Sequence, residues 1–230
     1  MDFARFQVLT FDCYGTLVDW ETGLLAALRP ILAAHGKTIP DSELLKLYSE
    51  LEAKEEAGPY RRYHEVLERI VAAIGDRLGF TPSTDETGSL PESIRRWPPF
   101  PDTIAALRRL KSRYKLAIVS NIDDALFAHS ARVLQVPFDA VITAEQCRSY
   151  KPSLNNFHAA MQRLEVDADA ILHCAESRFH DVAPARQLGI ASVWVNRHAA
   201  RPGPSASGAG EAIADLEVPD LKTLADRAGL

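Results

Sequence analysis

The chain has 230 residues, of which 47% are hydrophobic and 25% charged, and its 26 basic and 31 acidic residues give a net charge of −5. This composition excludes disorder, and the excess of acid argues against nucleic acid as a partner, because phosphate binding leaves a basic footprint. No apolar run approaches the ~20 residues that span a bilayer, so we expect no membrane partner.

The cysteine usage and the amino-terminus predict a cytoplasmic protein. The three cysteines, Cys13, Cys147 and Cys174, are odd in number and widely spaced. That pattern is typical of reduced thiols rather than of a disulfide framework. The first residues lack the basic start and long apolar stretch of a secretory signal.

Strand-like and helix-like segments alternate along most of the chain. Strands are expected at residues 7–11, 115–120, 140–143, 170–175 and 191–196, and helices at residues 103–114, 124–134, 154–164 and 182–188. Near-continuous apolar strands that alternate with helices indicate a parallel sheet covered on both faces. The predicted fold class is therefore α/β, with a Rossmann-like doubly wound parallel sheet.

Residues 20–97 interrupt this alternation, because they contain no convincing strand. Helices are expected at residues 23–35, 41–56, 60–78 and 90–96, and the proline-rich residues 97–101 then end the helical run. We expect residues 1–19 and 98–230 to form a catalytic core and residues 20–97 to form a helical cap inserted after the first strand. An ordinary helical subdomain without a lid role is the alternative.

The last part of the chain combines a loop and a short helix. Residues 200–210 are rich in Ala, Pro, Gly and Ser and predict a surface loop. A terminal helix is expected at residues 220–227.

One carboxylate, Asp12, directly follows the apolar run at residues 8–11. In an open parallel sheet, ligands bind at the carboxyl ends of the strands. A charge after a buried strand is hard to explain by stability alone, although an Asp that caps a turn is the structural alternative. Gly15 allows a tight turn there, and Thr16 adds a hydroxyl group beside the acid.

Three further polar groups follow later strands of the predicted sheet. They are Ser120 and Asn121, then Lys151 in SYKPSLNNF, then the acid pair Glu176 and Asp181. Together with Asp12 they would supply a nucleophile, hydrogen-bond donors, a cation and a second acid. Helix caps, a solvated lysine and a first-turn acid are the structural alternatives.

In this order the four motifs resemble those of the haloacid dehalogenase superfamily, and the resemblance covers nearly the whole chain. The phosphatases of that superfamily carry a second Asp two residues after the nucleophile, where this chain has Tyr14. A phenol with a reference pKa of ~10 does not readily replace a carboxylate that exchanges protons near neutral pH. The Tyr pattern looks like the L-2-haloacid dehalogenase branch, in which Asp attacks carbon rather than phosphorus.

The resemblance implies a mechanism in two steps. Asp12 would displace halide from the carbon next to the substrate carboxylate, with inversion, and water would then attack the carbonyl carbon of the resulting aspartyl ester. Lys151 would keep Asp12 ionised and, with Ser120 and Thr16, would bind the substrate carboxylate.

The same resemblance implies roles for two more residues and for metal. Asn121 would help to stabilise the leaving group, and Asp181 would orient Lys151 and assist the hydrolytic water. The dehalogenase branch works without metal, so we expect no cofactor. Mg²⁺ would be needed only by the phosphatase alternative, held by Asp12, the Tyr14 carbonyl and an acid of the fourth motif.

The chain departs from the dehalogenase pattern in the predicted cap. The better-known dehalogenases carry a cap Arg that binds the departing halide, and the matching residues 44–50 contain none. Arg61 or Arg62 would supply a cation from another helix, or they would be surface charges. Phe157 stands where a Tyr is often found in the third motif, and the resemblance makes it, like Arg61, a candidate substrate-binding residue.

A subset of the superfamily resembles this chain closely, with DCYGTLVDWETG-like, SNID-like, YKPxxNNF-like and AESxxHD-like segments. It includes an enzyme that opens the ring of L-azetidine-2-carboxylate, where a ring amine is the leaving group. Tyr14, Trp20, Asn121 and Asn156 are candidate pocket residues for such a reaction, and core packing is the alternative for Trp20.

The predicted function is therefore hydrolysis by an Asp nucleophile at the carbon next to a carboxylate, with (S)-2-haloacid dehalogenation as the leading reaction. Ring opening of L-azetidine-2-carboxylate and a Mg²⁺-dependent phosphatase are the enzymatic alternatives, and a non-catalytic binding protein is the third. We expect a small-molecule carboxylate as substrate and, by default, a homodimer.

Overall fold

The computed structural model describes residues 1–199 and 210–230. Six parallel strands form one sheet in the order β3-β2-β1-β4-β5-β6. The strands are β1 (Val8–Phe11), β2 (Lys115–Ser120), β3 (Ala140–Thr143), β4 (Ile171–Ala175), β5 (Ala191–Val195) and β6 (Leu216–Val218). The α/β fold class is confirmed. Apart from Gly210, the loop expected at residues 200–210 lies outside the described residues.

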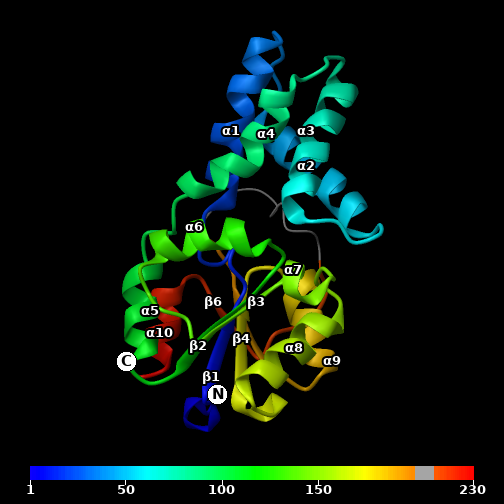
Figure 1. Ribbon diagram of the computed structural model, residues 1–230. Helices are drawn as coiled ribbons and strands as arrows, with labels where there is room; N and C mark the ends of the chain where they lie inside the picture. The colour runs from blue at the N-terminus through cyan, green and yellow to red at the C-terminus, as the bar shows by residue number, and fades with distance from the viewer. Residues whose placement is uncertain (200–209) are drawn as a thin grey trace.

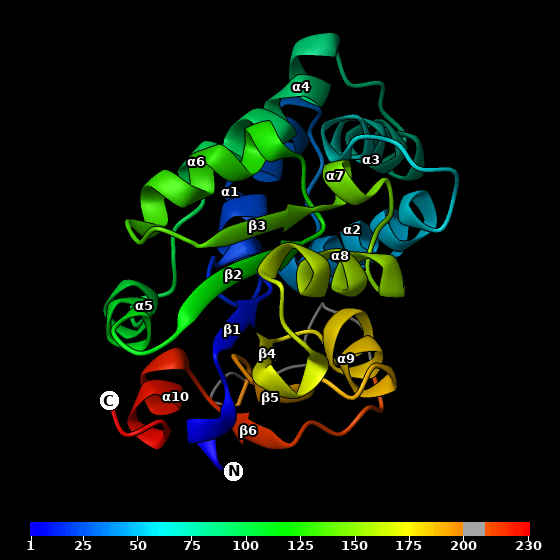
Figure 2. The ribbon, with the colours of Figure 1, turned by 60° about the horizontal axis from the view of Figure 1, so that its bottom comes forward.

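The sheet is covered by helices on both faces, with α5 and α10 on one side and α8 and α9 on the other (Figures 1 and 2). The helices are α1 (Trp20–Ala34), α2 (Asp41–Glu56), α3 (Tyr63–Leu78), α4 (Thr84–Ser93), α5 (Thr103–Lys111), α6 (Asp124–Leu134), α7 (Ala144–Cys147), α8 (Leu154–Leu164), α9 (Ala183–Gln187) and α10 (Leu221–Arg227). Short 3₁₀ turns are η1 (Phe3–Arg5), η2 (Ile94–Arg96) and η3 (Ala168–Ala170), and η4 (Arg178–Val182) is a π-helical turn. Within the described ranges, no helix is both long and apolar enough to cross a membrane.

Strand β1 lies at the centre of the sheet, between β2 and β4. All four of its residues are buried, as expected for a strand with helices on both faces. Its last residue, Phe11, pairs with Ile118 on one side and Cys174 on the other. The carboxyl ends of these three strands therefore lie at the same edge of the sheet, where the chain leaves β1 at Asp12.

Helices α1 to α4 lie together beyond this edge of the sheet (Figure 1). The chain enters them beside the place where it returns, since Val18 forms an antiparallel bridge with Pro99. Asp19 caps α1 by accepting a hydrogen bond from the Thr22 amide at 3.2 Å. The bridge holds the segment that leaves the sheet beside the segment that returns to it.

Asp123 ties helix α3 to the sheet. It follows β2, and its carboxylate accepts hydrogen bonds from the backbone amides of Tyr63 and His64, each at 2.8 Å. These amides belong to the first turn of α3, where no helical acceptor is available. A residue of the sheet edge therefore caps a helix that lies beyond it.

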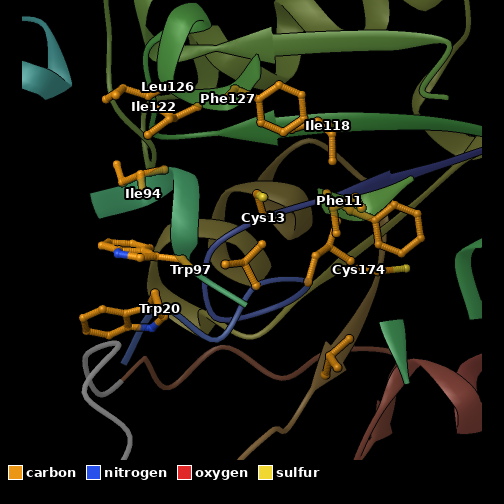
Figure 3. Close-up of a cluster of buried hydrophobic side chains, with 14 of the residues drawn as sticks. Phe11, Cys13, Trp20, Ile94, Trp97, Ile118, Ile122, Leu126, Phe127 and Cys174 are labelled. Atoms are coloured by element: carbon orange, nitrogen blue, oxygen red, sulfur yellow. The ribbon is translucent and has the colours of Figure 1, made fainter. Parts of the chain in front are cut away.

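One apolar cluster joins the sheet to the helices beyond its edge. Figure 3 shows Ile94 and Trp97, which end the helical run, close to Ile122 and Leu126, which follow β2. Cys13 lies between these side chains and the sheet residue Phe11. The burial is continuous, so the two parts of the chain share one core.

The sequence located the strands well and several helix ends poorly. All five predicted strands form, and each end lies within one residue of the prediction. The predictions of helices at residues 60–78 and 90–96 were wrong at their starts. Helix α3 begins at Tyr63, since Arg62 is still extended, and α4 begins at Thr84, where Ser83 and Glu86 form a capping box. Strand β6 was not predicted, because three residues are too few to show a periodicity.

Substitutions at two glycines test the packing between α1 and Trp97, where the chain returns to the sheet. A Cβ atom on Gly23 would lie 2.3 Å from the Trp97 ring, whereas the nearest atom to a Cβ on Gly88 in α4 is 4.0 Å away. We expect Gly23→Ala to lower the free energy of unfolding by ~1–3 kcal/mol through overpacking. Gly88→Ala should raise it by up to ~1 kcal/mol through helix propensity. Urea denaturation measures both, and equal effects would contradict this packing.

Candidate active site

The predicted motifs meet at one edge of the sheet. Asp12 follows β1, Ser120 ends β2, Lys151 lies in the loop before α8, and Asp181 lies in η4 after β4. Asp12, Lys151 and Asp181 are 7%, 2% and 1% exposed. Three of the four motifs thus place a buried charge at the same point.

Lys151 is the centre of this group. Its Nζ donates hydrogen bonds to Asp12 Oδ1 at 2.9 Å, to Asp181 Oδ1 at 2.6 Å and to the Val119 carbonyl at 2.9 Å. An ammonium group has three donors, so all of them are used. A buried charge is tolerated only when it is paired and hydrogen-bonded, and this arrangement meets both conditions.

The charges in this group shift one another's pKa values. Burial raises the pKa of Asp12, while the charge of Lys151 and the Thr16 hydrogen bond oppose that rise. Burial by itself would lower the pKa of Lys151, but the two carboxylates outweigh it and raise that pKa. Burial likewise opposes ionisation of Asp181, but Lys151 and His173 lower the pKa of Asp181 below its ordinary value. Lys151 is therefore cationic and Asp181 anionic at neutral pH.

A series of buried hydrogen bonds inside the sheet supports Asp181. His173 Nε2 lies 2.9 Å from Asp181 Oδ1, and His173 Nδ1 lies 2.8 Å from Thr10 Oγ1. Thr10 and His173 are register partners on β1 and β4. The sequence reasoning did not find this support, although both residues stand in otherwise apolar strands.

Thr16 lies behind Asp12 rather than in the cavity. Its hydroxyl donates to Asp12 Oδ2 at 2.9 Å and accepts from the Glu176 amide at 2.9 Å. Thr16 is fully buried and does not line the cavity. It positions the carboxylate, and the predicted contact of Thr16 with a substrate carboxylate is not available in this arrangement.

A cavity of about 340 Å³ opens over this group, between the sheet edge and the helices beyond it. It is lined by Asp12, Tyr14, Trp20, Tyr48, Ser49, Glu52, Ala53, Glu56, Tyr63, Trp97, Ser120, Asn121, Lys151, Ser177, Phe179, His180 and Asp181. This volume suits a small molecule. The buried Ser120 Oγ and Asp181 Oδ2 have no hydrogen-bond partner within the described ranges.

Tyr14 and Asn121 line the cavity with their polar groups already bonded. The Tyr14 hydroxyl lies 2.8 Å from Ser130 Oγ. Asn121 accepts from the Lys151 amide at 2.7 Å, and its amide group donates to the Lys151 carbonyl at 3.1 Å and to Glu56 at 3.2 Å. Asn121 therefore positions the lysine loop, and its hydrogen-bonding capacity is largely used.

Three residues predicted to bind substrate lie elsewhere. Arg61 does not line the cavity and pairs with Glu55 of α2 and Glu65 of α3 at 4.0 and 3.5 Å. Asn156 is buried and bonds to Ser149 at 3.0 Å, which shapes the loop before Lys151. Phe157 packs beneath β4, with its ring centroid 5.1 Å from that of His173. Spacing within a motif placed Asn156 and Phe157 near the lysine, but it did not say which way they point.

The sequence reasoning missed the residues that α2 and α3 contribute. Tyr48, Glu52 and Glu56 line the cavity from α2, and Tyr63 does so from α3. The first three recur every four residues, so they share one face of α2. That spacing was visible, but nothing in the sequence said that this face would be turned toward Asp12.

Both carboxylate oxygens of Asp12, which a magnesium site would need, are already hydrogen-bonded. Lys151 takes one oxygen each from Asp12 and Asp181, and Thr16 takes the second oxygen of Asp12. Glu176 does not line the cavity. Among residues 1–199 and 210–230, no three acidic, histidine or cysteine side chains are grouped to hold a metal ion. The donor set thus does not fit the phosphatase arrangement, and the expectation of no metal stays a prediction.

Comparisons with known proteins agree with this geometry. A family model described as haloacid dehalogenase-like hydrolase matches residues 6–189. The (S)-2-haloacid dehalogenase H-109 of Pseudomonas putida is 29% identical over 199 residues, covering 84% of this chain and 86% of that protein. The haloacetate dehalogenase H-2 of Moraxella sp. (strain B) is 26% identical over 203 residues, covering 84% and 87%.

Solved structures share the fold over almost the whole chain. An L-2-haloacid dehalogenase superposes with a TM-score of 0.83 at 26% identity, covering 97% of this chain and 99% of that one. The L-2-haloacid dehalogenase from Xanthobacter autotrophicus with chloropropionic acid covalently bound has a TM-score of 0.80 at 21% identity, covering 96% and 97%.

The fold and the matched family together define a hydrolase built on a Rossmann-like parallel sheet. The chain belongs to the haloacid dehalogenase-like hydrolase family.

His180 provides a pH-dependent test of the cavity wall. Burial lowers the pKa of His180 to about 4, below its ordinary value of 6.5. Between pH 6.5 and pH 4, this histidine is therefore protonated in the unfolded chain but not in the folded chain. The free energy of unfolding falls as the pH falls through this window, because protonation then favours the unfolded state. The loss should be at most about 3 kcal/mol.

We expect His180→Gln to remove that part of the acid sensitivity. Urea denaturation at pH 6.5 and pH 4.5 measures it, with the exposed His158→Gln in α8 as the matched control. If both variants lose stability between these pH values as steeply as the unmodified protein, His180 is not held neutral by the fold.

Proposed function

We propose that this protein hydrolyses (S)-2-haloacids by attack of Asp12 on the carbon next to the substrate carboxylate, through an aspartyl ester. One observation carries the proposal. Asp12 is bonded to a buried lysine, while the place of a second acid is taken by Tyr14, whose hydroxyl is bonded to Ser130. Burial raises the pKa of Tyr14 well above its ordinary value. Tyr14 therefore cannot exchange a proton with a phosphate ester near neutral pH.

The named relatives support the same chemistry. The matched proteins of Pseudomonas putida and Moraxella are named as dehalogenases of 2-haloacids and of haloacetate. The structure from Xanthobacter autotrophicus is described with chloropropionic acid covalently bound. Covalent attachment to the protein is the outcome expected of nucleophilic displacement at carbon.

In the first step, an oxygen of Asp12 forms a bond to the substrate carbon, the carbon–halogen bond breaks, and its electron pair leaves with halide. Lys151 supports this step by holding one oxygen of Asp12 at 2.9 Å. The unpartnered Ser120 hydroxyl faces the cavity beside them and would donate to the substrate carboxylate. Binding of that carboxylate orients the neighbouring carbon toward Asp12.

In the second step, water attacks the carbonyl carbon of the ester and releases the hydroxy acid, which restores the carboxylate of Asp12. Asp181 Oδ2 is buried at the cavity without a protein partner in the described chain, so it would accept a hydrogen bond from that water. Lys151 stays in place to balance the regenerated charge.

Residues 20–97 would act as a cap over a core of residues 1–19 and 98–230. Trp20, Tyr48, Tyr63 and Trp97 form the aromatic part of the cavity wall. Such a wall excludes bulk water from the ester and strengthens the charge interactions around Lys151. A cytoplasmic location, supported by three free cysteines, activity without a cofactor and a homodimeric state remain predictions of the same proposal.

Isotope labelling tests the ester. With enzyme in excess over L-2-chloropropionate in H₂¹⁸O, we expect a single turnover to leave ¹⁸O in Asp12 and none in the lactate hydroxyl, because the product oxygen comes from Asp12. Peptide mass spectrometry locates the label. Label in the lactate but not in Asp12 would mean that water attacks the substrate directly.

Replacement of the nucleophile gives the matching kinetic test. Asp12→Asn should lower kcat for halide release by about a thousandfold or more, as expected for loss of a nucleophile that acts with its partners as a unit. The exposed Asp85→Asn in α4 is the control and should be unchanged. Full activity of Asp12→Asn would refute the assignment.

A substitution at Ser120 tests substrate binding separately from the chemical steps. Because its hydroxyl has no protein partner in the described chain, Ser120→Ala should leave the free energy of unfolding within ~0.5 kcal/mol. The KM for L-2-chloropropionate should rise about tenfold, since one hydrogen bond to a charged group is worth roughly 1.5 kcal/mol or more. An unchanged KM would place the substrate carboxylate elsewhere.

A further inference from the structure

Tyr150 directly precedes Lys151, but its side chain does not line the cavity. It is 8% exposed, so the ring lies inside the protein. The Tyr150 hydroxyl donates a hydrogen bond at 2.9 Å to the backbone carbonyl of Arg61, two residues before α3 begins. The residue beside the central lysine is therefore bonded to the helical part of the chain that covers the cavity.

Residues 61–64, which we call the docking segment, contact the sheet edge at two further places. The carboxylate of Asp123 accepts hydrogen bonds from the last two backbone amides of the segment, each at 2.8 Å. Arg62 forms an ion pair with Glu145 of α7 at 2.9 Å. The contacts with Tyr150 and Asp123 end on backbone atoms of the segment, so they do not depend on which side chains line the cavity.

The rings around Tyr150 offer a direct comparison of two phenols. The centroid of the Tyr150 ring lies 5.6 Å from that of Tyr60 and 6.3 Å from that of Tyr63, distances at which aromatic pairs attract. The Tyr60 hydroxyl is also buried, but it has no hydrogen-bond partner among the described residues. Tyr60 and Tyr150 thus share one aromatic cluster, and of these two only the Tyr150 hydroxyl is bonded to the docking segment.

The position of the Lys151 ammonium group depends on how its loop is held. The Lys151 amide donates to Asn121 Oδ1 at 2.7 Å, and the Lys151 carbonyl accepts from Asn121 Nδ2 at 3.1 Å. The Nζ atom then reaches three acceptors at 2.6 to 2.9 Å. Because hydrogen bonds weaken steeply with poor geometry, a small displacement of this loop weakens all three at once.

We propose that Tyr150 is a positioning residue for Lys151, which joins the lysine loop to the docking segment and so makes the position of the ammonium group beside Asp12 depend on the docking of α2 and α3. This inference rests on the proposed attack by Asp12 and concerns what holds the positive charge beside it. Enclosure of the substrate by the helices and charge balance at the nucleophile thereby become linked, although Tyr150 touches neither the substrate nor Asp12.

Removal of one hydroxyl tests this link in the kinetics of halide release from L-2-chloropropionate. Tyr150→Phe should lower kcat about tenfold, because a small misplacement of a catalytic group has a large effect on rate. KM should stay within about twofold, since Tyr150 does not line the cavity. Tyr60→Phe, which removes the unbonded hydroxyl of the same cluster, is the matched control and should keep kcat within about twofold.

The pH dependence of kcat/KM distinguishes positioning from a purely structural role. The charged groups that face Asp12 are Lys151 and Asp181 from the sheet edge and Glu52 from α2. Burial raises the pKa of Tyr150, so its hydroxyl is neutral and Tyr150→Phe removes no charge. A less well placed Lys151 lowers the pKa of Asp12 less, so the acid limb should move to higher pH by about half a unit.

Hydrogen exchange of the backbone reports on the lysine loop without turnover. Peptides that contain Lys151 should exchange about threefold faster or more in Tyr150→Phe than in Tyr60→Phe, because the Lys151 amide is then held less firmly. An unchanged kcat, an unchanged exchange rate, or equal changes in the two variants would overturn the proposal. If Tyr150→Phe does not fold, Asp123→Asn, which removes one backbone acceptor at the docking segment, should lower kcat about threefold, and an unchanged kcat would then overturn it.

The same measurements separate this inference from the proposed function. If the unmodified protein releases no halide, the dehalogenation proposal fails, and the exchange of the Lys151 peptides alone decides whether Tyr150 positions the loop. If the unmodified protein releases halide and Tyr150→Phe releases it as fast at every pH, dehalogenation stands and the positioning role of Tyr150 is refuted.

Discussion

The structure depends on one buried ammonium group. Lys151 Nζ is bonded to Asp12, Asp181 and the end of β2, with the side chain 2% exposed. Removing one partner from a buried ion pair costs ~3–5 kcal/mol, because an unpaired charge then stays in a medium of low dielectric constant. The ends of β1, β2 and β4 and the loop before α8 must therefore meet within hydrogen-bond distance of one point. A parallel sheet with β1 at its centre provides that meeting place.

The support behind this group explains why polar residues stand inside the sheet. Thr10 and His173 are register partners on β1 and β4, and their hydrogen bonds end on Asp181. Thr16 does the same for Asp12 from the turn after β1. Apart from Asp181 Oδ2, the buried side-chain polar atoms of these residues are hydrogen-bonded, and networks of this kind hold a site rigid. Asp12 and Asp181 are thus oriented in part by Thr10, Thr16 and His173, which do not line the cavity.

The sequence predicted the part of the site that strand ends determine, and it failed where helix orientation decides. Asp12, Ser120, Lys151 and Asp181 were predictable because they follow strands of one parallel sheet, whose carboxyl ends must coincide. Arg61 does not line the cavity, because Arg62 is extended and α3 begins only at Tyr63, and the Arg61 side chain pairs with Glu55 and Glu65. Glu52 and Glu56 were missed because a helical face shows its spacing in the sequence but not the surface that it meets.

The sheet edge and the helices contribute different parts of the cavity. The lysine group holds the carboxylate of Asp12 in place, and it is built entirely from residues at the sheet edge. The opposite wall comes from α2 and α3, which contact the sheet edge through Asn121, Asp123 and Tyr150. The side chains of this wall can change without disturbing the lysine group, because none of the hydrogen bonds of Lys151 Nζ goes to it. Under the proposed function, the helical wall would therefore determine which substrates fit the cavity, while Asp12 and Tyr14 would determine that displacement occurs at carbon.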